Sequence, residues 1–152
     1  METAAHGTDR YLQPGWFTRN VFNKVMQGLA RVGLSLRGSR VLAVRGRTSG
    51  EWRAVPVNPL ELDGHCYLVA PRGRTQWVRN VRAGGEAELR LGRKVETVHP
   101  VEIADADKPE ILREYVRRWK AEVGRFFDGI DGNSTDDELL AIAPGFPVFR
   151  VR

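Results

Sequence analysis

The chain has little of several residue types on which small proteins often depend. Its 152 residues include one cysteine, Cys66, so neither an internal disulfide nor an all-cysteine zinc site can form. His6 and His65 have no carboxylate or histidine neighbours at ligand spacing, so we expect no metal site. No dinucleotide fingerprint, P-loop or supported Ser/His/Asp arrangement occurs, and we assign no catalytic residue. If the chain is an enzyme, a bound cofactor carries the difficult chemistry.

Long apolar runs are also missing. The first fifteen residues have no apolar core of secretory length, and no stretch approaches the length that spans a membrane, so we expect a cytoplasmic protein. A net charge of +5 suits an acidic small ligand, nucleic acid or an anionic membrane surface. With 41% hydrophobic residues, the length fits one domain over residues 1–152, and we expect residues 1–13 to be disordered.

An amphipathic helix is predicted over residues 14–32. Apolar side chains recur there at helical spacing, and basic ones fall elsewhere on the wheel. Its simplest role is to cover one end of the fold. The alternative is a peripheral contact with the inner face of the membrane, because a basic helix with a tryptophan suits an anionic lipid surface.

Three short strands are predicted between residues 40 and 70. The run 41–44 is rich in strand formers and too short for an independent helix, which predicts a strand buried on both faces. Asp63-Gly64 supplies the positive-φ residues of a hairpin turn. Pro56 and Pro59 cannot donate ladder hydrogen bonds, so their strand should lie at a sheet edge or be interrupted.

The turn between the first two strands has the sequence Arg47-Thr48-Ser49-Gly50. It offers backbone N–H groups, two hydroxyls, a glycine that tolerates positive φ and a guanidinium with a forked donor set. Arg53 on the return strand and the basic loop at 71–75 could bring further cations to the same place. This is the chemistry of a phosphate site. A solvated basic hairpin turn has the same composition, and the residues alone do not choose between them.

The remaining elements complete the fold prediction. A short helix over residues 76–82, capped near Thr75, precedes a strand at 86–91 and another at 94–104 whose apolar face would include His99 as a structural residue. A capping box at 107–110 should open a long helix, and Ser134 with Asp137 a shorter one, before a last strand at 146–151. This order predicts an α+β fold built on a small antiparallel barrel.

The order of these motifs resembles the deazaflavin-dependent nitroreductase family. The resemblance runs from about residue 20 to residues 146–150 and is carried by residues 46–50, Arg53, Pro56 and Pro59, Asp63-Gly64, Pro71-Arg72-Gly73 and Trp77-x-x-Asn80-x-x-Ala83. Members of this family are oxidoreductases that use reduced coenzyme F420, a deazaflavin, as a hydride donor. The resemblance therefore implies a small antiparallel split β-barrel, similar to FMN-binding split barrels, with an N-terminal helix and flanking helices.

The resemblance also implies a set of cofactor contacts. The turn and Arg53 would hold the phosphate and anionic tail, and the return strand, the end of the third strand and the following helix would line the ring. The residues so implied are Arg47, Thr48, Ser49, Gly50, Arg53, Ala54, Val55, Pro56, Val57, Val69, Ala70, Pro71, Arg72, Gln76, Trp77, Val78, Arg79 and Asn80. Hydride would pass to a quinone, nitro compound, enone or other small activated electron acceptor.

Departures from the family pattern leave alternatives open. A position that is often lysine in the family is Thr48 here, so Arg45, Arg47 and Arg53 would have to supply its charge. Tyrosines that shape the substrate side in relatives have no counterpart near residues 126–127. The main alternative is a split barrel that binds FMN. A non-catalytic cofactor carrier is the rival from another class, and a nucleic-acid-binding module is disfavoured. We expect a monomer or a homodimer.

Overall fold

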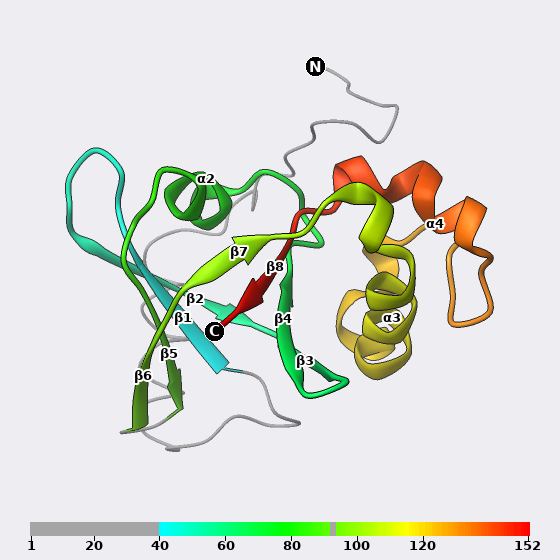
Figure 1. Cartoon of the computed structure of the whole chain (residues 1–152), viewed down its shortest axis with the longest axis horizontal. Coiled ribbons are helices and arrows are strands. Elements are labelled where there is room, and N and C mark those ends of the chain that lie inside the picture. Colours follow the sequence, from blue (N-terminus) through cyan, green and yellow to red (C-terminus); the bar gives the residue numbers. More distant parts are fainter. Residues whose placement is uncertain (1–39, 92–93) are drawn as a thin grey trace.

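The computed structural model describes residues 40–91 and 94–152 (Figure 1). The predicted N-terminal segment 1–13 and helix 14–32 lie outside these residues. None of the helices in the described ranges is long and apolar enough to cross a membrane. The described elements, in chain order, are β1 (Arg40–Arg45), β2 (Trp52–Val57), β3 (Leu60–Leu62), β4 (His65–Val69), α2 (Gln76–Arg82), β5 (Ala87–Leu91), β6 (Lys94–Val98), β7 (Pro100–Glu102), η2 (Asp105–Asp107), α3 (Pro109–Val123), η3 (Gly124–Phe126), α4 (Asp136–Ile142), η4 (Ala143–Gly145) and β8 (Val148–Val151).

The strands form two antiparallel four-stranded sheets with the orders β2-β1-β5-β6 and β3-β4-β8-β7. The chain passes from one sheet to the other three times, between β2 and β3, between β4 and β5 through α2, and between β6 and β7. The two sheets therefore share a core, although they do not close into one barrel. The α+β class is confirmed. Among the described strands β2 lies at a sheet edge, as Pro56 predicted, and Pro59 lies beyond the end of this strand.

The first core lies between the two sheets and beneath α2. All four residues of the run 41–44 are buried, as their apolar sequence predicted. Leu42 and Val44 point into this core with Leu68 and Phe149 of the second sheet and Val78 of α2. Since β1 is central in its sheet and covered on both sides, it is the strand on which the hairpin turn and α2 are positioned.

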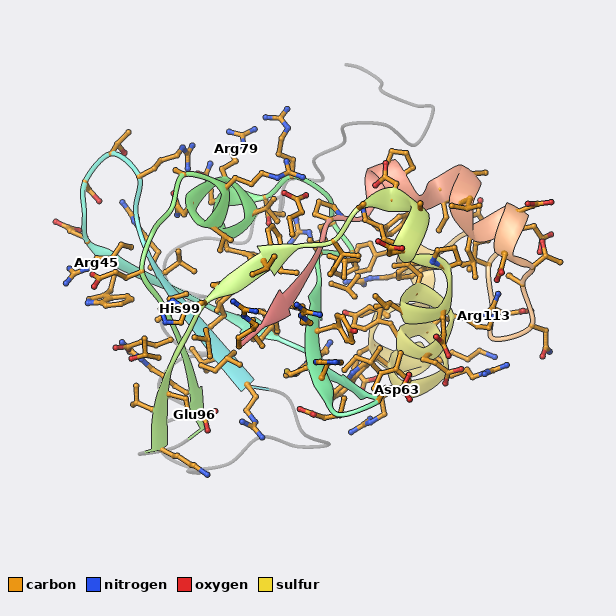
Figure 2. The ribbon with its side chains drawn as sticks, in the orientation of Figure 1. Arg45, Asp63, Arg79, Glu96, His99 and Arg113 are labelled. Atoms are coloured by element: carbon orange, nitrogen blue, oxygen red, sulfur yellow. The ribbon has the colours of Figure 1, made fainter. Side chains whose placement is uncertain are left out.

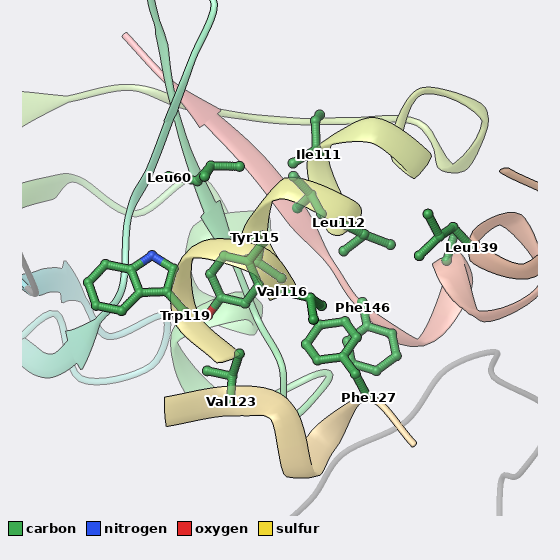
Figure 3. Close-up of a cluster of buried hydrophobic side chains, with 13 residues drawn as sticks. Leu60, Ile111, Leu112, Tyr115, Val116, Trp119, Val123, Phe127, Leu139 and Phe146 are labelled. Atoms are coloured by element: carbon green, nitrogen blue, oxygen red, sulfur yellow. The ribbon is translucent and has the colours of Figure 1, made fainter. Parts of the chain in front are cut away.

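The second core packs α3 and α4 against the other face of the β3-β4-β8-β7 sheet (Figure 3). The apolar residues Ile111, Leu112, Tyr115, Val116 and Trp119 recur at helical spacing along α3, and all of them are buried. Phe127 stacks on Phe146 with ring centroids 4.3 Å apart. The indole nitrogen of Trp119 donates to the Pro59 carbonyl at 2.9 Å, so α3 also fixes the connection that follows β2.

The predicted capping box at the start of α3 is wrong. A 3₁₀ turn at residues 105–107 makes Lys108 the N-cap, in the αR region and without a side-chain cap bond. The Lys108 ammonium is instead buried, 2.7 Å from Asp105 Oδ1 and 3.0 Å from the Ala143 carbonyl. The capping box occurs at α4, where Thr135 and Glu138 exchange bonds one residue later than the predicted pair.

The predicted single strand over residues 94–104 is also wrong. It divides at His99 into β6 and β7, which belong to different sheets, and the His99 main chain pairs with Arg152. His99 is exposed, as are Val95 and Thr97, whereas Val98 is buried. The inward face is therefore not the one that alternation suggested, because the strand changes sheets within the pattern.

Candidate functional site

The candidate site begins at the hairpin turn between β1 and β2. Its base is closed by main-chain bonds from Gly46 N to Glu51 O at 2.8 Å and from Gly50 N to Gly46 O at 3.0 Å. Ser49 Oγ accepts from Glu51 N at 3.1 Å, and Gly50 adopts a φ of 74°. The turn thus has the positive-φ glycine that the sequence predicted, and its conformation is supported by its own side chain.

The turn docks on α2 through Arg47. Its main-chain nitrogen donates to Asn80 Oδ1 at 3.0 Å, and its Nη1 donates to Asn80 Oδ1 at 2.8 Å and to Gln76 Oε1 at 2.9 Å. The helix has the predicted bounds, and Gln76 and Asn80 are one turn apart on it, so both reach the same guanidinium. Two parts of the predicted site that lie about 30 residues apart in sequence are thereby brought together.

Several donors of the turn have no hydrogen-bond partner within residues 40–91 and 94–152. They are the main-chain N–H groups of Thr48 and Ser49 and the Nε and Nη2 atoms of Arg47, and all three residues are exposed. Arg53, exposed on β2, has no carboxylate within ion-pair distance in the same ranges. Consecutive N–H groups without a described partner, beside guanidinium groups without a described carboxylate, have the chemistry that suits an anion.

Arg45 also contacts the turn, because its Nη1 donates to Gly50 O at 2.9 Å. The expectation that it could supply the charge of the family's lysine stays a prediction. Arg45 pairs with Glu86 at 3.2 Å and lies 4.5 Å from the Trp52 ring, across from it in the β1–β2 register. Because Val44 and its partner Arg53 face the shared core side, Arg45 and Trp52 face the other side of the sheet. Figure 2 shows Arg45 at the hairpin, apart from Arg79 on α2.

The outer edge of β2 is the second part of the site, and no described strand pairs with it. Arg45 N donates toward β5, to Glu86 O, whereas Gly46 N donates to Glu51, so alternate pairs of β1 and β2 are hydrogen-bonded. By this alternation the N–H and C=O of Ala54 and the C=O of Pro56 point away from β1. Pro56 occupies a position where its missing N–H costs no ladder bond.

The predicted ring-lining residues fall into two groups. Val57, Val69, Ala70 and Val78 are buried in the two cores, and Val55 packs against the core that the sheets share. Trp77 is half-buried, with its ring centroid 5.7 Å from that of Phe149. The residues with accessible surface are Ala54, Pro56, Pro71, Arg72, Gln76, Trp77 and Arg79. The side chains of Val57, Val69, Ala70 and Val78 are buried, so only the main-chain atoms of these residues would contact a ligand.

One residue of the site was not anticipated from the sequence. Gly85 follows α2, and its N–H donates to Asn80 O at 3.1 Å. A Cβ atom at this position would lie 2.8 Å from Arg45 O and 3.1 Å from Asn80 O. The only signal in the sequence was the glycine pair at 84–85, which indicated a turn and not a close approach of two main chains.

Cys66 is not equipped for nucleophilic chemistry. Burial, followed by the neighbouring Glu61 carboxylate, raises the pKa of its thiol from 9.0 to about 12. A thiol of this kind stays protonated at neutral pH, and Cys66 packs against the core that the two sheets share. In the described ranges, no group of three His, Cys, Asp or Glu side chains is placed to hold a metal ion.

Residues 16–130 match the family described as F420H(2)-dependent quinone reductase. A search of curated proteins found no match.

Three solved structures are similar in fold. One, described as a domain-swapped dimer, is 20% identical, with a TM-score of 0.53 over 92% of this chain and 100% of its own. An F420-H2 dependent reductase, FDR-A, is 21% identical, with a TM-score of 0.51 over 75% of this chain and 93% of its own. A protein of unknown function from Agrobacterium tumefaciens is 18% identical, with a TM-score of 0.54 over 93% and 58% of the two chains. At these identities, the likeness concerns the fold.

Proposed function

The chain belongs to the F420H(2)-dependent quinone reductase family, and on this premise we propose that it transfers hydride from reduced coenzyme F420 to a small quinone. It is accordingly an oxidoreductase whose cofactor is coenzyme F420. The observation that carries the proposal for this chain is a juxtaposition. A turn with unpaired anion-binding donors lies at one end of a strand whose outer edge is unpaired among the described residues.

The donor set of the turn fits the phosphate and anionic tail of the coenzyme. Thr48 and Ser49 offer consecutive main-chain N–H groups and hydroxyls, and Arg47 and Arg53 supply positive charge that no described carboxylate neutralises. Phosphate oxygens accept from such groups without needing a lysine at position 48. Arg72, which precedes α2, and Arg79, which lies on α2, would extend the cationic surface along the tail of the coenzyme.

The outer edge of β2 fits the polar edge of a flavin-like ring. Ala54 would present one N–H donor and one C=O acceptor, and Pro56 a further acceptor. Main-chain groups on a strand whose far end is fixed by Trp119 are held rigidly, and rigid donors and acceptors orient a planar ligand well. When bound, the reduced coenzyme supplies the hydride; these residues would bind and orient it.

A quinone is the acceptor that the family favours, and a nitro compound or an enone are further candidates because each accepts hydride at an activated position. We assign no general acid. Burial raises the pKa of Tyr115, and this residue lies in the helical core, where it is bonded to Asn58. Solvent is the proposed source of the proton.

Cofactor binding is the first experiment. Oxidised F420 and FMN would be titrated in parallel into the full-length protein, with tryptophan fluorescence as the signal. We expect saturable quenching by F420, with affinity at least about tenfold weaker in Arg47→Ala and Ser49→Ala. Arg125→Ala, at an exposed arginine remote from the turn, should bind as the wild type does. Saturable binding of FMN alone would instead support a flavin protein, and quenching by neither would refute the proposal.

Turnover would then be measured with reduced F420 and a panel of a quinone, a nitroaromatic compound and an enone. The quinone should give the highest kcat/KM. If only the nitro compound or the enone is reduced, the acceptor part of the proposal fails while the cofactor part stands.

Assembly and placement in the cell are further parts of the proposal. We propose that residues 1–152 form one domain, and the similar domain-swapped dimer supports a homodimer over a monomer. Light scattering of the full-length chain separates these states. A peripheral membrane contact through residues 14–32 predicts co-flotation with anionic liposomes, and equal flotation of a chain starting after residue 31 would exclude it.

A further inference from the structure

Asn80 differs from the accessible residues of the proposed site because it is buried. It is 3% exposed, whereas Gln76, one turn earlier on α2, is exposed. A buried carboxamide destabilises the fold unless its polar atoms are bonded. Both bonds that its oxygen accepts come from Arg47, one from the main chain and one from the guanidinium. The oxygen therefore faces the hairpin turn and is already used.

The main chain of Asn80 is engaged as well. Its carbonyl accepts from Gly85 N, and Gly85 in turn lies so close to Arg45 O that a Cβ atom would be 2.8 Å away. One residue thus joins α2, the turn that follows it and the end of β1. The position of the hairpin turn relative to the helix depends on this junction.

We propose that Asn80 is a positioning residue, which holds the 47–50 turn against α2 so that the donors of the turn and the arginines of residues 72–79 act on one anionic ligand. This inference rests on the proposed function and assigns the residue a role other than direct contact with the coenzyme. A turn that is already held in its binding conformation loses little conformational entropy when a ligand binds. A turn that is no longer held loses more, so the ligand binds more weakly.

The first test needs no coenzyme. Asn80→Leu keeps the approximate size of the side chain and removes the acceptor oxygen. We expect amide hydrogen exchange at Arg47 to become at least about tenfold faster, while exchange at Val44 in the buried strand stays unchanged. Asn133→Leu is the matched control, at an exposed asparagine of another loop, and should leave Arg47 unaffected. Unchanged exchange at Arg47 in Asn80→Leu would overturn the inference.

Asn80→Asp distinguishes the effect of the acceptor oxygen on the position of the turn from the effect of charge on ligand binding. It also provides a second test if Asn80→Leu does not fold. A carboxylate still accepts from Arg47, so exchange at Arg47 should stay slow. Its negative charge compensates the guanidinium, so the affinity for oxidised F420 should fall. Fast exchange at Arg47 in this variant would contradict the role assigned to the oxygen.

The second test uses the coenzyme. In Asn80→Leu the Kd for oxidised F420 should rise about 10- to 100-fold, and KM for the reduced coenzyme should rise with kcat at saturation within about twofold. A fall in kcat with KM unchanged would overturn a positioning role. If the wild type binds no F420 yet Arg47 exchange accelerates in Asn80→Leu, the proposed function fails while the role of Asn80 in holding the turn stands.

Discussion

Replacing Gly85 by alanine tests how closely α2 and β1 are fitted together. The added methyl carbon would lie 2.8 Å from Arg45 O, 3.1 Å from Asn80 O and 3.2 Å from Val44 Cγ1. The first two neighbours are main-chain oxygens, which cannot rotate away as the end of a side chain would. Either the helix or the strand has to shift.

Overpacking of this kind costs about 1–3 kcal/mol. For a chain of this length, each kcal/mol lowers Tm by about 2–4 °C, so we expect a decrease of about 2–12 °C. Because the shift would separate Asn80 from the turn, F420 affinity should fall in the same variant. Urea and thermal unfolding followed by circular dichroism measure the first effect, and fluorescence titration the second.

Gly124→Ala is the matched control for this substitution. Gly124 has a φ of −53°, and a Cβ atom there would lie 3.7 Å from Lys120 Cγ, an ordinary contact. Alanine at a compatible position stabilises by about 0.4–1 kcal/mol, so the two variants should change stability in opposite directions. A Gly85→Ala protein within about 0.5 kcal/mol of wild type would refute the close fit of α2 on β1.

Two further predictions concern the second core and the lone thiol. Trp119→Phe removes the indole N–H that donates to the Pro59 carbonyl. The unpaired carbonyl and the smaller ring should lower the free energy of unfolding by about 2–4 kcal/mol. Urea unfolding measures this change, and an unchanged midpoint would contradict it. Since the pKa of Cys66 is raised from 9.0 to about 12, the folded state keeps a proton that the unfolded state loses between these values. Stability should therefore fall as pH rises through this window, and the fall between about pH 8 and pH 10 should be smaller in Cys66→Ala.

Local chemistry was enough to predict several parts of the site. Gly50 and the Asp63-Gly64 pair adopt positive φ, as turn residues of these types do, and α2 has the predicted bounds. Pro56 predicted an edge strand because proline lacks the N–H that an interior strand needs on both sides. These features depend on a few neighbouring residues, so they can be predicted without knowing the rest of the fold.

Errors arose where two distant segments meet. Arg45 and Arg47 look equivalent in the sequence, but Arg45 contacts Glu86, Trp52 and the Gly50 carbonyl, while Arg47 reaches α2. Alternation over residues 94–104 misplaced His99 because the strand leaves one sheet and enters the other. Neither outcome follows from composition or spacing.

The sequence by itself determined the turn chemistry, the apolar strand at 41–44, the helical stripe of α3 and the family resemblance, since each is written in residues close together in the chain. Only the tertiary structure decided which arginines keep their charge available, which edge of β2 stays unpaired among the described residues, and that Asn80 is bonded to the turn. Those properties depend on pairing across distant segments, where register and packing choose the partner of each polar group.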